Sequence, residues 1–119
     1  MIKSYRDLIV WQKAMDLAVS VYRLTRTFPS SERFGLVSQI QRAAASVPSN
    51  IAEGHCRDTR GDYRRGISIA KGSVGELETR LELARRLEYL PDHLHQEIAG
   101  RVAEVGKILT ALAKRLGRK

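Results

Sequence analysis

The sequence has a single cysteine, Cys56, and only 6% aromatic residues among 119 positions. One cysteine cannot form an internal disulfide or supply the several thiolates of a structural zinc site. No apolar run approaches the length of a membrane-spanning helix, and charges interrupt every short apolar run near the N-terminus. We therefore expect no signal peptide, no membrane association and a cytoplasmic location.

The signatures of several enzyme classes are also missing. There is no glycine-rich phosphate loop of the Walker type, and no histidine follows a glutamate by three residues, as a di-iron bundle requires. His55, Cys56 and Asp58 are residue types of a thiol nucleophile site, but sequence neighbours do not face one another on a helix. His93 and His95 also point apart. The sequence predicts no enzyme, no catalytic residue, no metal site and no cofactor.

What the chain does contain is helical periodicity, because apolar residues recur every three to four positions and no segment alternates with the period of a strand. Ser4 with Asp7 has the form of a capping box, and so does Thr59 with Asp62. Gly54 is the expected left-handed residue after the second helix. We predict helices over about 5–28, 31–54, 60–89 and 92–117 in one domain, 1–119. The short connections predict an all-α, antiparallel up-down-up-down four-helix bundle.

The first predicted helix has two apolar faces. One seam comprises Leu8, Trp11, Met15, Ala18 and Tyr22, and the other comprises Val10, Ala14, Leu17, Val21, Leu24 and Phe28. One antiparallel neighbour cannot cover both seams. We therefore expect one seam inside the bundle and the other against a further element or a second subunit.

The second predicted helix carries a polar stripe beside its apolar one, with Pro48 in its middle. We call this stripe the polar seam, and it consists of Gln39, Arg42, Ser46, Asn50 and Glu53. As a buried network it would fix the register between helices or subunits, and as a site it would form a pocket. The network is the favoured interpretation, because amides and carboxylates without a histidine or nucleophile have no evident reaction.

Three glycines lie inside the third predicted helix. Gly66, Gly72 and Gly75 each cost about 1 kcal/mol relative to alanine in a helix interior. That cost predicts a close backbone approach to the small residues at positions 43–45 of the second helix. The alternative is that one or two of these glycines are exposed and merely tolerated.

The chain is basic, with a net charge of +8 and a pI near 10.2. A charge of this sign favours a polyanionic partner, most plausibly nucleic acid. The predicted basic cluster comprises Arg57, Arg60, Arg64, Arg65 and Lys71. Arginine suits phosphate because its planar guanidinium can bind two oxygens. Equally compatible with the sequence is a solvated face whose arginines pair with Asp58, Asp62 and Glu76.

Four segments in order resemble one known family. They are WQKA at 11–14, FPSSERFGL at 28–36, SVPSNIAEG at 46–54 and IAKGSVGEL at 69–77. Together they resemble the four-helix bundle proteins of the 23S rRNA intervening-sequence family. The resemblance implies a ring-shaped homopentamer with no established enzymatic activity. A related branch, the accessory variability determinant of diversity-generating retroelements, implies nucleic acid and a reverse transcriptase as partners.

Two functional hypotheses follow. The leading one is a non-enzymatic, oligomeric bundle that contacts RNA or DNA weakly through a basic surface. Few aromatic residues accompany the arginines, so contact with phosphate without base-specific readout is expected. The alternative is a protein–protein interaction scaffold with no nucleic-acid role, in which the first helix and the polar seam recruit a partner.

Overall fold

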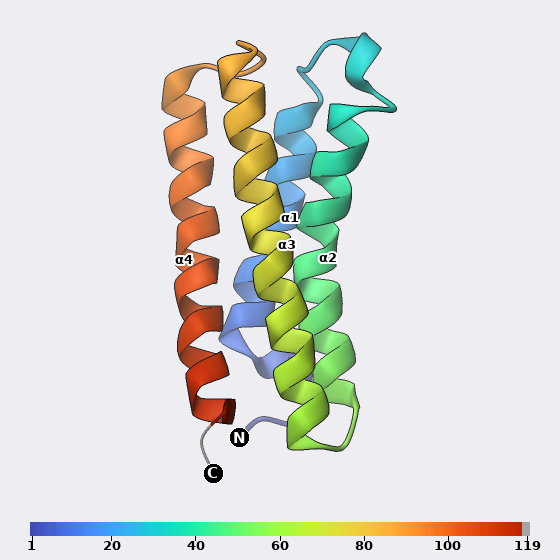
Figure 1. The fold of residues 1–119 in the computed structure, drawn as a ribbon, viewed down its shortest axis with the longest axis vertical. Helices are drawn as coiled ribbons and strands as arrows, with labels where there is room; N and C mark the ends of the chain where they lie inside the picture. The colour runs from blue at the N-terminus through green and yellow to red at the C-terminus, as the bar shows by residue number, and fades with distance from the viewer. Residues whose placement is uncertain (118–119) are drawn as a thin grey trace.

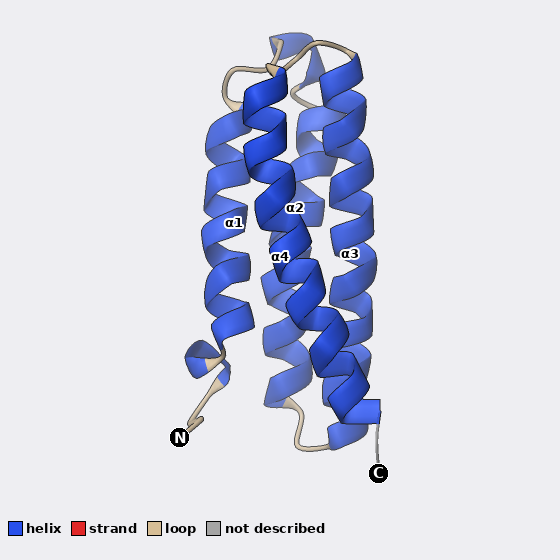
Figure 2. Ribbon diagram, turned by 90° about the vertical axis from the view of Figure 1, so that its left-hand side faces the viewer, coloured by secondary structure: helices blue, strands red, loops and turns tan. Residues whose placement is uncertain are grey.

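The computed structural model describes residues 1–117, which form helices and no strand over that range (Figures 1 and 2). The α-helices are α1 (Ile9–Thr25), α2 (Leu36–Cys56), α3 (Arg60–Arg86) and α4 (Asp92–Gly117), and the 3₁₀ turns are η1 (Tyr5–Asp7) and η2 (Ser30–Glu32). The four α-helices lie side by side along the long axis of the molecule (Figure 1). The prediction of an all-α chain with four helices is confirmed. No helix in the described part of the chain is long and apolar enough to cross a membrane.

The core lies between the apolar faces of all four helices. Its fully buried members recur at the predicted helical spacings, and they include Ala14, Val21, Ile40, Val47, Ile51, Ile67, Leu77, Leu81, Val102, Val105 and Leu109. Fully burying a valine, leucine or isoleucine side chain contributes about 1.5–3 kcal/mol, so the larger of these residues stabilise the fold substantially. The most extensive pairing is between α2 and α3.

The first α-helix is shorter than the sequence predicts. Ser4 and Asp7 do form a capping box, with the Arg6 N–H donating to Ser4 Oγ at 3.1 Å. That box closes only the η1 turn, because Leu8 then takes an extended conformation (φ −73°, ψ 124°). Local hydrogen bonds thus stabilise a separate turn, and α1 begins at Ile9 instead of about residue 5.

The second helix also begins later than predicted. Ser30–Glu32 form the η2 turn, and α2 starts at Leu36. Glu32 Oε1 accepts a bond from the Leu36 N–H at 3.3 Å, which satisfies one of the free donors at the start of the helix. Glu32 Oε2 accepts a further bond from the Tyr89 hydroxyl at 2.8 Å, so the same carboxylate joins this turn to the segment after α3.

The left-handed C-terminal residue is found at α3 and not at α2. No described glycine has a positive φ, and Gly54 lies buried within α2, so the prediction for Gly54 is wrong. Glu88 has φ 63°, and the Tyr89 N–H donates to the Ala84 carbonyl at 2.9 Å. This is the pattern of a helix that ends in a left-handed residue, and it explains why α3 stops at Arg86.

Glycine has a packing role at one crossing of α2 and α3. A Cβ built on Gly66 would lie 2.5 Å from the Asn50 carbonyl oxygen and 2.9 Å from Gly54 Cα. The predicted close approach therefore exists, but at Gly54 instead of residues 43–45. Gly72 and Gly75 have nothing within 4 Å of such a Cβ, so the alternative of exposed, tolerated glycines holds for these two.

Glu82 of α3 is the acceptor of an ion-pair cluster with the residues that follow it. Its carboxylate accepts bonds from Arg85 at 2.6 and 3.0 Å and from Arg86 at 2.9 Å, and His95 Nε2 lies 3.5 Å away. Hydrogen bonds from Arg85 and Arg86 to the charged form lower the pKa of Glu82 from 4.5 to about 2.

The depressed pKa gives a testable pH dependence. Glu82 binds its proton less readily in the folded chain, so its contribution to stability is present above about pH 4.5 and disappears as the pH falls through about 2. Urea unfolding of the native chain and of Glu82→Gln should therefore differ most above pH 4.5 and converge toward pH 2. The difference will be modest, because the side chain is 35% exposed. A difference that does not change with pH would contradict the assignment.

Candidate interaction surfaces

The members of the predicted basic cluster lie in three different settings. Arg60 caps a helix, since its Nε donates to the Leu116 carbonyl at 3.0 Å and its Nη2 to the Arg115 carbonyl at 2.6 Å. The last carbonyls of α4 have no intrahelical partner, and the positive charge also suits the negative end of the helix dipole. Arg60 thus joins the start of α3 to the end of α4.

Arg57 and Arg65 line a small cleft of about 160 Å³ near the connection between α2 and α3. Glu53 and Asp62 line the same cleft. Carboxylates so close to the guanidinium groups reduce the local positive potential. This part of the cluster is mixed in charge, but within the described residues neither arginine forms the ion pairs with Asp58, Asp62 or Glu76 that the sequence suggested, and Glu76 pairs with Arg80 instead.

Arg64 and Lys71 instead face the groove between α3 and α4. The opposite wall carries Lys107 and Lys114, and we call the surface formed by these four cations the basic groove. Two adjoining hollows of about 620 and 570 Å³ form it, and they share Lys71, Thr110 and Lys114. Small residues line the rest, namely Ser68, Gly75, Ala103, Gly106, Ala111, Ala113 and Gly117, with Val74 and Glu78. No aromatic side chain is among the described lining residues.

Lys107 and Lys114 were not among the predicted site residues. The available signal was the spacing of seven, which separates Lys107 from Lys114 and also Arg64 from Lys71. Residues seven apart lie on one side of a helix about 10.5 Å apart, because each residue adds about 1.5 Å. Only the pairing of α3 with α4 brings the two rows together.

The polar seam is divided between the α2–α3 contact and solvent. Ser46 Oγ lies 2.7 Å from Ser73 Oγ, and Asn50 Nδ2 donates to the Ser46 carbonyl and hydroxyl at 2.8 and 2.9 Å. Gln39 Oε1 accepts a bond from Arg80 Nη1 of α3. These side chains link α2 to α3. Arg42 and Glu53 are exposed, and they take no part in the network.

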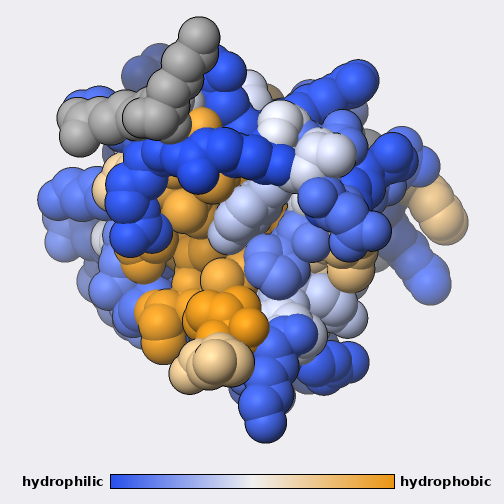
Figure 3. All heavy atoms as spheres, turned by 90° about the horizontal axis from the view of Figure 1, so that it is seen from below, coloured by the Kyte–Doolittle hydropathy of each residue, from blue (hydrophilic) through white to orange (hydrophobic). Residues whose placement is uncertain are grey.

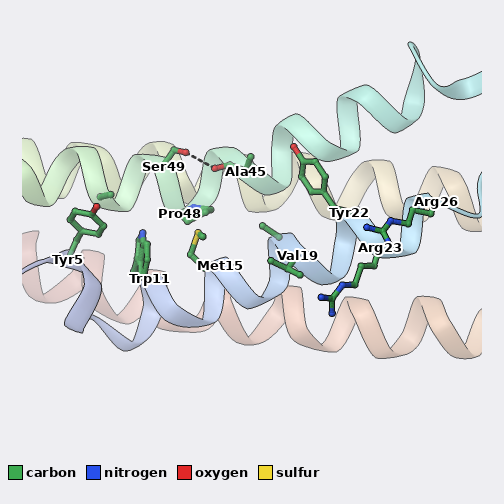
Figure 4. Close-up of a pocket in the computed structure, with 12 residues that line it drawn as sticks. Tyr5, Trp11, Met15, Val19, Tyr22, Arg23, Arg26, Ala45, Pro48 and Ser49 are labelled. Carbon is green, nitrogen blue, oxygen red and sulfur yellow. Dashed lines mark hydrogen bonds between the residues drawn. The ribbon is translucent and has the colours of Figure 1, made fainter.

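An apolar groove of about 600 Å³ lies between α1 and α2 (Figure 4). From α1 it is lined by Trp11, Met15, Ala18, Val19, Tyr22, Arg23 and Arg26, from α2 by Ala45, Pro48, Ser49 and Ala52, and from η1 by Tyr5. Met15, Val19 and Tyr22 remain 38%, 44% and 42% exposed. The first apolar seam of the first helix, apart from Leu8, thus opens onto this groove, and the second seam faces the core.

The end of the bundle near the termini carries a second apolar surface (Figure 3). A hollow of about 740 Å³ is lined there by Leu8, Ile9, His55, Tyr63, Ile108, Leu112 and other residues. The His55 and Tyr63 rings meet edge to face at 5.1 Å, and burial raises the pKa of Tyr63 above its usual value, with an opposing effect of Arg115. His55 is thus engaged in ring packing, while Cys56 is exposed. No group of three metal-binding side chains occurs among residues 1–117.

Comparison with known proteins identifies the family. The family model of the 23S rRNA-intervening sequence protein matches residues 6–111. The chain belongs to the 23S rRNA-intervening sequence protein family. A crystal structure at 1.70 Å of a protein of unknown function from the S23 ribosomal protein family, from Bacteroides thetaiotaomicron VPI-5482, is similar in fold. It is 28% identical, with a TM-score of 0.83, and the match covers 89% of this chain and 96% of that chain. The comparison with curated proteins gave no match.

The resemblance of this chain to the 23S rRNA-intervening sequence protein family rested on four segments, and the structure gives several of them packing roles. Segments 46–54 and 69–77 meet through the Ser46–Ser73 contact. Segment 46–54 also supplies Gly54 at the crossing of α2 and α3. Segment 28–36 supplies Glu32, which caps α2. The motifs that identify this family member therefore specify helix packing and helix ends.

Proposed function

We propose that this family member is a non-enzymatic, antiparallel up-down-up-down four-helix bundle that assembles as a ring-shaped homopentamer in the cytoplasm. In this proposal a basic surface contacts RNA or DNA without base-specific readout. The observation that carries the proposal is the row of cations in the basic groove, on a chain with a net charge of +8. Cations placed together at a surface attract the phosphate backbone and release its bound counterions.

The composition of the groove determines the expected kind of recognition. Base stacking needs aromatic or arginine planes against the base, and reading of base edges needs amide or guanidinium pairs at fixed positions. The basic groove offers mainly lysine, which acts as a point charge on a flexible stem. Binding through such groups positions a phosphate chain and does not select a sequence.

Salt titration tests the proposal. Fluorescence anisotropy with two labelled RNA strands of different sequence should give nearly equal affinities at low salt. Both affinities should fall steeply as salt rises, with a slope of about −3 in the logarithmic plot if four cations each neutralise one phosphate. Absence of binding at low salt, or an affinity indifferent to salt, would overturn the proposal.

A protein–protein interaction scaffold is the second candidate function. The apolar groove between α1 and α2 favours it, because exposed Met15, Val19 and Tyr22 together form a surface suited to a protein partner. A reverse transcriptase is the partner implied by the resemblance to the accessory variability determinant. If the salt titration detects no RNA or DNA binding, the scaffold becomes the favoured function.

A further inference from the structure

We propose that the basic groove holds the phosphate backbone of a single nucleic-acid strand between α3 and α4, with Lys107 and Lys114 as principal contacts. This inference rests on the proposed function and replaces the predicted basic cluster by a different set of residues. Arg64 and Lys71 belong to both sets, whereas Arg57 and Arg65 lie outside the groove.

The basic groove holds almost no negative charge to offset its cations. Within the described residues, Arg64, Lys71, Lys107 and Lys114 form no ion pair, and the same holds for Arg57 and Arg65, so what distinguishes the groove is its near lack of carboxylates. The ion pairs of the surface lie elsewhere. Lys13 pairs with Glu104 at 3.2 Å, Arg80 with Glu76 at 3.1 Å, and Arg85 with Glu82 at 2.6 Å. Only one carboxylate, that of Glu78, lines the two hollows against the four cations. The donors of the groove are therefore available to an external anion.

The cations of the basic groove lie on two facing walls. The helix contacts place the start of α3 beside the end of α4, since a Cβ on Gly117 would lie 3.7 Å from Arg64 Nε. Farther along, Val74 of α3 faces Gly106, with 3.4 Å between its Cγ1 and a Cβ on that glycine. Cations from both helices can therefore flank a nucleic-acid strand lying along the groove. On each wall the two cations are about 10.5 Å apart along the helix axis.

The side chains between the cations of the groove are small. Glycine, alanine, serine and threonine occupy most of the positions where α3 and α4 would otherwise present long side chains. A Cβ built on Gly75 would have nothing within 4 Å. The phosphate backbone of a nucleic-acid strand can consequently approach the helix surfaces. Its negative charge then lies within reach of lysine ammonium groups from both sides.

A paired set of variants distinguishes this groove from the predicted basic cluster. Lys107→Gln with Lys114→Gln removes two positive charges from the groove, and Arg57→Gln with Arg65→Gln removes two from the cleft. The net charge is the same in both double variants, so any effect of net charge alone on binding is equal in the two. The probe is a fluorescein-labelled oligouridylate of about 20 nucleotides, longer than the roughly 4–16 that one small binding module covers.

We expect the lysine double variant to bind the probe about tenfold more weakly at low salt, with a salt slope shallower by about 1.4. The arginine double variant should stay within about twofold of the native chain, because nearby carboxylates already offset its charges. Circular dichroism checks that both variants remain helical, as expected for exposed side chains.

The outcomes distinguish failure of the proposed function from failure of the groove assignment. If the native chain fails to bind the probe at low salt, the proposed function fails. If it binds and the arginine variant loses affinity while the lysine variant does not, the proposed function stands and the groove assignment fails. Equal losses in both variants also overturn the groove, because they show a diffuse effect of charge. If polyglutamate of the same total charge binds as tightly as the RNA, the occupant is an acidic protein segment and the assignment again fails.

Discussion

Gly66→Ala should destabilise the protein by about 3 kcal/mol, one of the two largest effects expected from a single substitution. The new Cβ would lie 2.5 Å from the Asn50 carbonyl oxygen and 2.9 Å from Gly54 Cα. Both neighbours are backbone atoms within α2, so no side-chain rotation can relieve the contact. The helices would have to separate at this crossing, which loosens the α2–α3 packing along the core.

Gly72→Ala is the matched control for this substitution. It is the same chemical change in the same helix, but a Cβ at Gly72 has nothing within 4 Å. Only the helix propensity then changes, and alanine is favoured over glycine by about 1 kcal/mol. We therefore expect Gly72→Ala to stabilise the chain and Gly66→Ala to destabilise it.

Urea unfolding followed by circular dichroism measures both free energies of unfolding. Because the free energy of an oligomer depends on concentration, all variants are compared at one protein concentration. If both alanine variants shift stability in the same direction by a similar amount, the close approach at Gly66 is not a constraint in solution.

Most of the fold could be predicted from the sequence because helix formation here follows local periodicity. The seam of Ile67, Leu77 and Leu81 is buried as its spacing indicates. Helix ends were less predictable, since they depend on competing local bonds. Ser4 and Asp7 supply a good cap, but nothing in the sequence says that the chain straightens at Leu8 and that the cap serves only a 3₁₀ turn.

The candidate sites were predictable only where one helix alone determines them. The apolar face containing Met15 and Tyr22 could be seen in the sequence, because a single helix cannot hide two seams in one core. The basic groove could not, since its walls come from α3 and α4 and the pairing of Lys71 with Lys114 depends on how far one helix is shifted along the other. The close contact of Gly54 with Gly66 likewise needs the crossing point of two helices.

If the proposed ring assembles through the apolar groove, Val19→Glu should convert it to monomers, which is the second large effect that we expect. Val19 is 44% exposed in one chain and lines the apolar groove between α1 and α2, and the proposed ring would use this groove as the interface between its subunits. Arg23 and Arg26 also line the groove and can pair with the new carboxylate, but removing a charged group from water at an interface still costs several kcal/mol per ion. A closed ring repeats that cost at every interface, so assembly should be lost while the helical content of each chain is kept.

Leu83→Glu provides the control for the oligomer test. Leu83 is 46% exposed on α3, so the change replaces an apolar side chain of similar exposure by the same carboxylate outside the apolar groove. Light scattering at micromolar concentration should give the mass of a pentamer for the native chain and for Leu83→Glu, and the mass of a monomer for Val19→Glu. A native chain that is already monomeric would refute the proposed ring. The loss of assembly in Leu83→Glu alone would instead place the interface on α3, and the exposed apolar residues of α1 would then be left for a different protein partner.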